Sequence, residues 1–257
     1  MKIFYKMIPK VIKEIVKYFY YPTKRFIGDT IRKGKINYLQ RINYTDLDFY
    51  YKNIYSQHGE DGILAEIIKR LGIDSGWVVE FGAWDGKKFS NTFNLVTQGF
   101  QAVYIEGDQE KYNELKKTAD EYKNIHPIKT YIEESGVNSL DNVLENTKCP
   151  KDFDVLSIDI DSNDYQIWQC FKNYNPKIVV IEVNSSVALN VEAIYSKETR
   201  RVGTSFSSML KLGNEKGYIC VLHTGNMIFA RNDLVYKIYR GQQERLYKHI
   251  KTTKYRR

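Results

Sequence analysis

Residues 77–92 read WVVEFGAWDGKKFSNT, which has the pattern of a buried strand that breaks into a tight loop. The apolar run Trp77–Phe81 contains one acid, Glu80, and two glycines four apart, Gly82 and Gly86, follow it. Glycine has no Cβ and tolerates positive φ, so the backbone of this loop can come close to a ligand. An acid at the strand end can accept hydrogen bonds from hydroxyl groups or bind a cation. The stretch therefore predicts a loop that holds a nucleoside cofactor.

The length of 257 residues, 42% of them hydrophobic, allows one sizeable α/β domain with appendages. The three cysteines, Cys149, Cys170 and Cys220, are odd in number and far apart, and no CxxC pair occurs. This usage predicts neither a disulfide framework nor a zinc site and favours a reducing cytoplasm.

Positive charge is concentrated at the two ends of the chain. Residues 1–41 carry a net charge of +9 and residues 236–257 carry +7, so the total of +8 leaves −8 for the residues between them. A groove that binds nucleic acid normally runs through a basic folded body, so this distribution argues against nucleic acid as a partner. Basic ends could bind membrane-bound or anionic glycan intermediates.

Residues 1–20 place apolar side chains at helical spacing with lysines between them. The charges interrupt the run too often for a membrane span or for the apolar region of a signal peptide. Two interpretations stay open. An interfacial helix on anionic lipid would place the protein peripherally at the inner face of the membrane. A helix packed on the domain or on a partner chain is the other, and Pro9 favours it because proline weakens helix continuity.

Strand-like and helix-like segments alternate with short connections after residue 60, which predicts a mostly parallel sheet with helices on both faces. Two strand-like runs near the end are joined at Gly225–Asn226, a hairpin signal. We therefore expect an α/β fold with a C-terminal antiparallel hairpin. The expected parts are a basic N-terminal helical extension (1–55), a folded domain (56–235) and a basic C-terminal helical tail (236–257).

Acids and amides follow several of the predicted strands, at the edge where open α/β sheets bind ligands. Glu106 ends the second strand 24 residues after Gly82, close to where a Rossmann-type unit places its ribose-binding acid. The fourth strand carries Asp159 and Asp161 at i and i+2, so on an extended backbone both carboxylates point the same way. The remaining members of the set are Asp164, Glu182 and Asn184.

The polar segment SQHGEDG, residues 56–62, precedes a helix that leads into the first strand. It can line the cofactor or substrate cleft, or Ser56 or Asp61 can serve only as a helix cap. Both interpretations stay open at this point.

Three stretches together resemble the class I S-adenosylmethionine-dependent methyltransferases, and among these the FkbM-like branch associated with surface polysaccharide and natural-product sugars. They are SQHGEDG, VEFGAWDG with the following SNT, and LSIDIDSNDY with the later VVIEVNSS. The resemblance covers residues 55–235. It implies a Rossmann-like methyltransferase fold in which Glu80, Gly82 and Gly86 shape the cofactor loop. It also implies that Glu106 holds the ribose, that Glu133 lies near the adenine, and that Gln57 lies near the methionine part or the substrate.

The sequence departs from the family pattern at two places. Trp84 stands where many methyltransferases have a second glycine, which is tolerable if its side chain points away from the ligand. The fourth strand reads IDID where many FkbM-like sequences read IDVEG, so glycan specificity cannot be transferred.

Methyl transfer to an alcohol needs either a base or a cation to remove the hydroxyl proton. Candidate bases are Asp159, Asp161, His58 and His223, with His223 favoured among the histidines because it ends a strand beside the hairpin. Asp159, Glu182 and Asn184 look like the oxygen ligands with which catechol O-methyltransferase binds Mg²⁺.

The leading hypothesis is an S-adenosylmethionine-dependent O-methyltransferase acting on a sugar hydroxyl of a nucleotide-sugar or of a surface polysaccharide such as a capsule. The alternatives are a methyltransferase acting on a non-sugar small molecule and a binding protein that keeps the fold without turnover. A nucleotide-dependent oxidoreductase is disfavoured, because it would be expected to show G-x-G-x-x-G and this chain has only Gly82 and Gly86.

Overall fold

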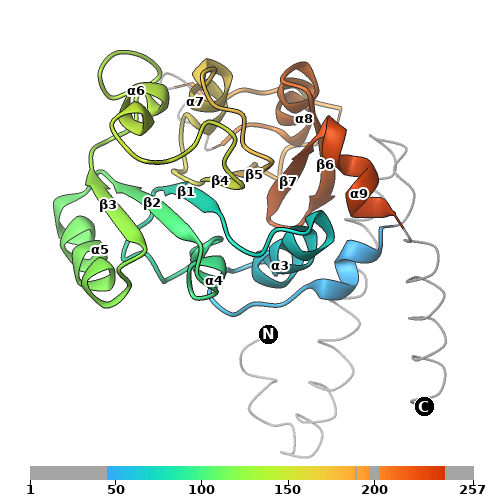
Figure 1. The fold of residues 1–257 in the computed structure, drawn as a ribbon. Helices are drawn as coiled ribbons and strands as arrows, with labels where there is room; N and C mark the ends of the chain where they lie inside the picture. Colours follow the sequence, from blue (N-terminus) through green and yellow to red (C-terminus); the bar gives the residue numbers. More distant parts are fainter. Residues whose placement is uncertain (1–44, 189, 197–202, 241–257) are drawn as a thin grey trace, which may run out of the picture. The chain divides into compact units, whose positions relative to one another are not determined.

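The computed structural model describes residues 45–188, 190–196 and 203–240, which contain one seven-stranded sheet. The strand order is β3-β2-β1-β4-β5-β7-β6 (Figure 1). Strands β1 to β5 pair in parallel, and β7 pairs antiparallel with both β5 and β6. The strands are β1 (Trp77–Phe81), β2 (Gln101–Glu106), β3 (Ile125–Lys129), β4 (Val155–Ile158), β5 (Ile178–Glu182), β6 (Tyr218–His223) and β7 (Asn226–Arg231).

Helices cover both faces of the sheet (Figure 1). One face carries α3 (Glu60–Leu71), α4 (Phe93–Val96) and α5 (Gln109–Glu121), and the other carries α6 (Leu140–Glu145), α7 (Asp164–Cys170) and α8 (Phe206–Glu215). The short elements η1 (Asp46–Tyr50), η2 (Asn232–Leu234) and α9 (Val235–Tyr239) complete the described chain, and η1 and α9 both contact α3. The expected α/β fold with its C-terminal hairpin is confirmed.

The central strands are apolar because both of their faces are covered. Val79, Val103, Leu156 and Val180 are fully buried, one on each of four adjacent strands. Each such side chain contributes about 1.5–3 kcal/mol relative to an exposed one. Helix starts are set by side-chain caps, with acceptor oxygens from Asp108 (α5), Ser139 (α6) and Ser205 (α8).

Two predicted strands end earlier than the sequence pattern indicates. Strand β3 stops at Lys129, the partner of Glu106, because β2 also ends there, so residues 130–132 form a loop. Strand β4 stops at Ile158, and residues 159–163 are likewise irregular. Both segments are thereby freed from sheet pairing at the edge where ligands bind.

The predictions for the two ends of the chain fall largely outside the described residues. The N-terminal helix and its two interpretations concern residues 1–20, and most of the predicted basic tail lies beyond residue 240. Within the described tail, α9 is helical as expected, although short. The limits of the three predicted parts stay a prediction.

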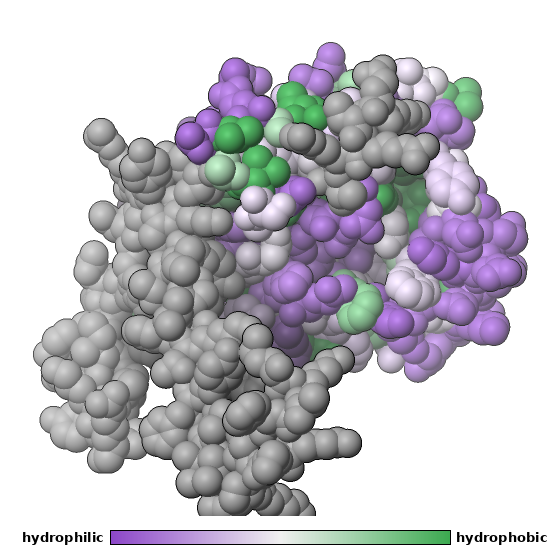
Figure 2. Space-filling model, turned by 180° about the vertical axis from the view of Figure 1, so that it is seen from behind, coloured by the Kyte–Doolittle hydropathy of each residue, from purple (hydrophilic) through white to green (hydrophobic). Residues whose placement is uncertain are grey.

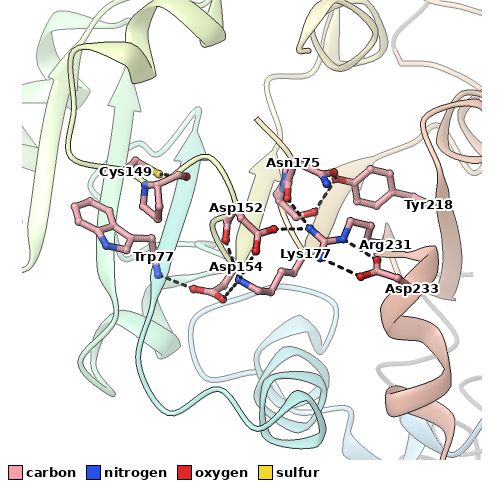
Figure 3. A network of polar contacts seen from close by, with 11 residues as sticks. Trp77, Cys149, Asp152, Asp154, Asn175, Lys177, Tyr218, Arg231 and Asp233 are labelled. Atoms are coloured by element: carbon pink, nitrogen blue, oxygen red, sulfur yellow. Dashed lines mark hydrogen bonds and ion pairs between the residues drawn. The ribbon is translucent and has the colours of Figure 1, made fainter. Parts of the chain in front are cut away.

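The amino ends of the strands are joined by a network of ion pairs and hydrogen bonds (Figure 3). Asp154, just before β4, accepts hydrogen bonds from the Trp77 backbone N–H at 2.8 Å and from Lys177 Nζ at 2.9 Å. Arg231, at the end of β7, pairs with Asp152 and Asp233. Each acid of this network is thus paired with a cation of the protein itself.

Seen from behind, hydrophilic side chains cover most of the coloured surface, and hydrophobic ones form small groups among them (Figure 2). The coloured residues on this side of the molecule thus form no broad apolar surface of the kind that binds a partner. Among the described residues, no helix has the length and apolar character needed to cross a bilayer.

Candidate functional site

A cavity of about 700 Å³ opens at the carboxyl ends of β1, β2 and β4. This is the position at which open α/β sheets bind ligands. Segments from the loops after β1, β2, β3 and β4 form its walls. The predicted residues that line it are Gln57, Glu80, Gly82, Glu106, Asp159 and Asp161.

The two glycines of the β1 loop allow close packing on two different sides of the loop. Both have left-handed φ, 76° at Gly82 and 79° at Gly86. A Cβ at Gly82 would lie 2.2 Å from the carbonyl oxygen of Asp159, so glycine lets the loop approach the end of β4. A Cβ at Gly86 would lie 2.8 Å from Leu115 of α5. Gly82 thus borders the cavity, whereas Gly86 allows the loop to pack behind it.

Glu106 ties the β1 loop to the end of β2. One carboxylate oxygen accepts from the Trp84 backbone N–H at 2.9 Å, and the other accepts from the Asp108 N–H at 2.7 Å. The side chain is buried yet lines the cavity. Each carboxylate oxygen can accept a further hydrogen bond, so Glu106 keeps capacity for two ligand hydroxyls.

Glu80 is occupied by protein donors. Its carboxylate accepts from Ser90 Oγ at 2.9 Å and from the Thr92 N–H at 3.1 Å, and Thr92 Oγ1 and the Asn91 N–H also donate to it. Burial raises the pKa of Glu80, and these hydrogen bonds partly offset that rise. The SNT segment is therefore explained by Glu80, which anchors it beside the cavity, and direct contact of Glu80 with a ligand stays a prediction.

The segment at residues 56–62 is held from two directions. The Asp61 carboxylate accepts from three consecutive backbone N–H groups, of residues 54, 55 and 56, each at 2.8 Å, and from Ser56 Oγ at 2.7 Å. Ser56 Oγ accepts in turn from the Asp61 N–H, while the N-cap residue of α3 is Gly59. Asp61 thus shapes the whole turn rather than only capping the helix, and Gln57 projects from this turn into the cavity wall.

Glu60 joins the same turn to the β6–β7 hairpin. It is fully buried and accepts from the His58 N–H and from Thr224 Oγ1, at 2.8 and 2.7 Å. Asn226 Nδ2 donates to the same oxygen as Thr224 at 3.3 Å. This clamp has no local sequence signal, since its partners are more than 160 residues apart.

Three carboxylates converge where β4 and β5 end. Ligand atoms of Asp159, Asp161 and Glu182 lie within 4.8 Å of one another. The predicted reason was wrong, because neither aspartate is on an extended strand and Asp161 has a left-handed φ of 57°. Asp164 instead shapes this turn by accepting from the Ile160 and Ser162 N–H groups at 3.0 Å.

Burial and the repulsion of neighbouring charges raise the pKa values of Asp159 and Glu182. Burial comes first for Asp159, followed by the charges of Glu182, Asp164 and Asp161, and its pKa rises to about 8. Burial and then Asp161 raise the pKa of Glu182 to about 7. Because their charges interact, Asp159 and Glu182 titrate as a coupled pair near neutral pH.

Like Gly86, several other predicted residues do not line the cavity, among them Glu182, Asn184, His223 and Glu133. Glu182 belongs to the carboxylate group just described. Asn184 accepts from the Ser186 N–H at 3.0 Å. His223 is buried, with Nε2 3.0 Å from Ser185 Oγ and its ring against Phe206. Glu133 is exposed and forms a bridge with Ser139, so the loop beside the cavity is formed instead by residues 130–132. The predicted roles of these four residues stay predictions.

Several lining residues carry no sequence signal for a site. Tyr131 lies over Gly107, where a Cβ would come within 2.1 Å of its ring. Lys88, Phe89 and Lys111 lie at the rim. Trp84 also lines the cavity, and its indole Nε1 donates to Glu114 on α5 at 3.2 Å, which directs the side chain toward the rim.

No family model matches this chain, and neither does any curated protein. Among solved structures, a putative caffeoyl-CoA O-methyltransferase from Staphylococcus aureus is 12% identical, with a TM-score of 0.49, and the match covers 78% of this chain and 98% of that one. The N-terminal domain of EvdMO1, solved with SAH and D-fucose, is also 12% identical, with a TM-score of 0.43 and coverages of 67% and 82%. TrmK of M. capricolum, in complex with S-adenosyl-homocysteine, is 14% identical, with a TM-score of 0.39 and coverages of 65% and 67%. Likeness at this level carries no information about chemistry, which must be argued from the residues.

Proposed function

We propose that this chain is an S-adenosylmethionine-dependent O-methyltransferase that acts on a sugar hydroxyl. The observation that carries the proposal is Glu106, a buried acid that lines the cavity at the end of β2 and ties down the β1 loop. An acid at this position of a Rossmann-like unit binds ribose hydroxyls. FkbM-like membership and the sugar acceptor rest on the sequence resemblance.

The charge of the cavity favours a cationic cofactor. Five acids line it, namely Glu80, Glu106, Asp108, Asp159 and Asp161. They complement the positive charge of a sulfonium, whereas the diphosphate of a dinucleotide would be repelled at the cavity floor. Moreover, α4 begins only at Phe93, so no helix N-terminus directly follows the β1 loop to receive phosphates. These features favour methyl transfer over hydride transfer.

Asp159 is the best placed proton acceptor for the acceptor hydroxyl. S-adenosylmethionine, when bound, supplies an electrophilic methyl group, so the remaining task of the protein is to position the alcohol and take its proton. A base works best when its pKa is near the working pH, and the pKa of Asp159 is about 8. Asp161 and Glu182 assist by raising that pKa. His223, which is buried outside the cavity wall, is the weaker candidate.

Asp159, Asp161 and Glu182 also fit a divalent cation. They offer only carboxylate oxygens, the ligand type preferred by Mg²⁺, and Asp161 stands in the group where the sequence pattern placed Asn184. A bound cation would acidify an acceptor hydroxyl. Unchanged turnover after EDTA treatment and desalting would remove this part of the proposal.

The test of the cofactor is calorimetry with S-adenosylhomocysteine and with NAD. We expect a dissociation constant for S-adenosylhomocysteine well below about 1 mM, and no competition by NAD for the S-adenosylhomocysteine site. Glu106→Ala should weaken S-adenosylhomocysteine binding by about 10- to 100-fold, the effect of losing charged hydrogen bonds. Glu110→Ala is the matched control, because Glu110 is an exposed acid at the start of α5, four residues after Glu106, and does not line the cavity. Absence of binding to the wild-type protein contradicts the proposal.

The test of the acceptor is mass spectrometry of candidate glycans and nucleotide-sugars, in which a gain of one methyl group is expected. Asp161→Ala should abolish this gain and leave the affinity for S-adenosylhomocysteine nearly unchanged, because Asp161 follows β4 whereas the proposed ribose-binding acid, Glu106, ends β2. An equal loss of affinity and turnover would instead place Asp161 in the cofactor site.

A further inference from the structure

Two lysines stand at the rim of the cavity against one indole ring. The ammonium nitrogens of Lys88 and Lys111 lie 4.4 and 4.8 Å from the ring centroid of Trp84. The exposed ring of Phe89 completes the group, 5.2 Å from the Lys88 nitrogen. We call these four residues, all of which line the cavity, the aromatic–lysine rim.

The aromatic members are held in a backbone conformation that their side chains disfavour. Trp84 has a φ of 48° and Phe89 a φ of 62°, in the left-handed region that residues other than glycine rarely adopt. Such residues persist where their surroundings impose the conformation, and they concentrate at ligand sites. At Trp84 the hydrogen bonds to Glu106 and Glu114 impose it, and they hold the indole beside the two lysines.

Among the described residues, the ammonium groups of the rim lysines differ from those of their neighbours in making no direct ion pair or hydrogen bond, although Asp108 is close enough to Lys111 to interact with its charge. Lys87 pairs with Glu121, and Lys129 donates to the carbonyl of Gly107. Within the part of the chain that the structure describes, no carboxylate lies within ion-pair distance of Lys88 or Lys111. Two ammonium groups beside one ring repel each other, and an anion between or beside them would relieve that repulsion.

Charge is therefore divided across the cavity. The floor, where the strands end, carries Glu80, Glu106, Asp159 and Asp161. Among the described residues that line the cavity, the basic ones are Lys88 and Lys111, and the remaining acid, Asp108, lies beside Lys111. A ligand anion is repelled at the floor and attracted at the rim, so a ligand that carries phosphates would be oriented with them outward.

We propose that the aromatic–lysine rim binds the diphosphate of the acceptor, which makes the acceptor a sugar carried on a diphosphate rather than a neutral glycan. This inference rests on the proposed function, because it places the phosphates beside the cavity that holds the methyl donor. The exposed ring of Phe89 offers a stacking surface for a nucleobase attached to that diphosphate.

A carboxylate of the cofactor is the competing anion, since the methionine part of S-adenosylhomocysteine carries one. The analogue 5′-methylthioadenosine lacks this part. Comparison of the two compounds therefore separates a lysine that binds the cofactor from one that binds the acceptor.

The experiment is calorimetry of the full chain with inorganic pyrophosphate and with UDP, in buffer that contains EDTA so that no cation holds the ligand at the acids. Lys88→Met and Lys111→Met remove the charge and keep most of the side chain. We expect each to weaken pyrophosphate binding by about tenfold, and the double variant by about 100-fold. Lys88→Arg should restore most of the affinity, while Lys117→Met, on the exposed side of α5, should leave it unchanged.

The proposal holds if the double variant loses pyrophosphate and keeps its affinity for S-adenosylhomocysteine and its melting temperature. Tighter binding of UDP than of pyrophosphate would identify a nucleoside-linked acceptor, and equal binding a diphosphate alone. Wild-type binding weaker than about 1 mM, or no loss in the double variant, overturns the proposal. The proposal is also overturned if the double variant loses affinity for S-adenosylhomocysteine but keeps its affinity for 5′-methylthioadenosine. Failure of the proposed function is seen separately, as no binding of S-adenosylhomocysteine to the wild-type chain.

Discussion

An aspartate flanks strand β4 at each end, and the two differ in the charge of their neighbours. Asp154, before the strand, is buried against Lys177 at 2.9 Å within the network of Figure 3. Asp159, after the strand, has Asp161 and Glu182 as its charged neighbours, and among the described residues no lysine or arginine pairs with it. At the amino edge each acid of the network pairs with a cation, whereas at the carboxyl edge the neighbouring acids among the described residues have only one another.

The difference separates acids that support the fold from acids kept for a ligand. At the amino edge, the hydrogen bond from Arg231 lowers the pKa of Asp233, so ionisation there is favourable. At the carboxyl edge, burial and neighbouring charges raise the pKa of Asp159. An arrangement that opposes its own ionisation weakens the fold, and such arrangements are characteristic of functional sites.

The largest effect is expected from breaking the amino-edge network. Lys177→Met would leave the Asp154 carboxylate buried without its cation, and we expect a loss of about 3 kcal/mol in the free energy of unfolding. Urea denaturation monitored by circular dichroism measures it. Lys151→Met, an exposed lysine near the same edge, is the control and should change stability by less than about 0.5 kcal/mol. Equal effects of the two substitutions would mean that the network adds nothing to the free energy of unfolding.

Asp159→Asn should raise the free energy of unfolding, whereas Lys177→Met should lower it. The pKa of Asp159 is about 8 when folded against a usual value of 3.8, so the folded protein binds this proton more tightly. Raising the pH from about 4 to 8 therefore favours the unfolded chain at this group. We expect the substitution to be nearly neutral at pH 4 and to stabilise by on the order of 1–3 kcal/mol at pH 8.

The two ends of β4 are compared most directly by making the Asp-to-Asn substitution at Asp154 as well as at Asp159. Asp154→Asn should destabilise at pH 8, because it removes the partner of Lys177. Denaturation curves of both variants from pH 5 to 8 provide the measurement. Destabilisation by Asp159→Asn across this range would remove the distinction between the two edges.

The smallest effect concerns Mg²⁺. If Asp159, Asp161 and Glu182 hold the cation, 10 mM Mg²⁺ at a dissociation constant of about 1 mM should stabilise the protein by about 1.4 kcal/mol, a rise of a few degrees in Tm. The rise should be larger at pH 8 than at pH 6, since the carboxyl groups must release their protons to bind. Asp159→Asn should abolish it, and an unchanged Tm in the wild type would contradict the metal hypothesis.

The fold was predictable because its signals are local. Apolar runs that end at Glu80 and Glu106 indicate strands, the helices between them indicate parallel pairing, and Gly225–Asn226 indicates the hairpin. The convergence of Asp159 and Glu182 followed from their places at the ends of neighbouring strands. These features depend on periodicity and connection length alone.

The remainder of the site depends on contacts that periodicity does not encode. The left-handed conformations of Trp84 and Phe89 arise from tertiary hydrogen bonds and packing, and aromatic residues give no sign of positive φ. Tyr131 reaches the cavity because β3 stops at Lys129, where its neighbour β2 also stops. Sequence pattern locates such ends only to within a few residues.

The adjacent acids Glu60 and Asp61 imply an order in which the cavity wall forms during synthesis. The partners of Asp61 lie five to seven residues before it, so the turn that carries Gln57 can form as soon as this segment leaves the ribosome. Glu60 has one local partner, the His58 N–H, and its two side-chain partners lie 164 and 166 residues later, at the hairpin turn. Contacts of such separation form late. A nascent chain that ends before Thr224 thus presents a buried acid without its clamp, and the wall at Gln57 is completed only when the last two strands have joined the sheet.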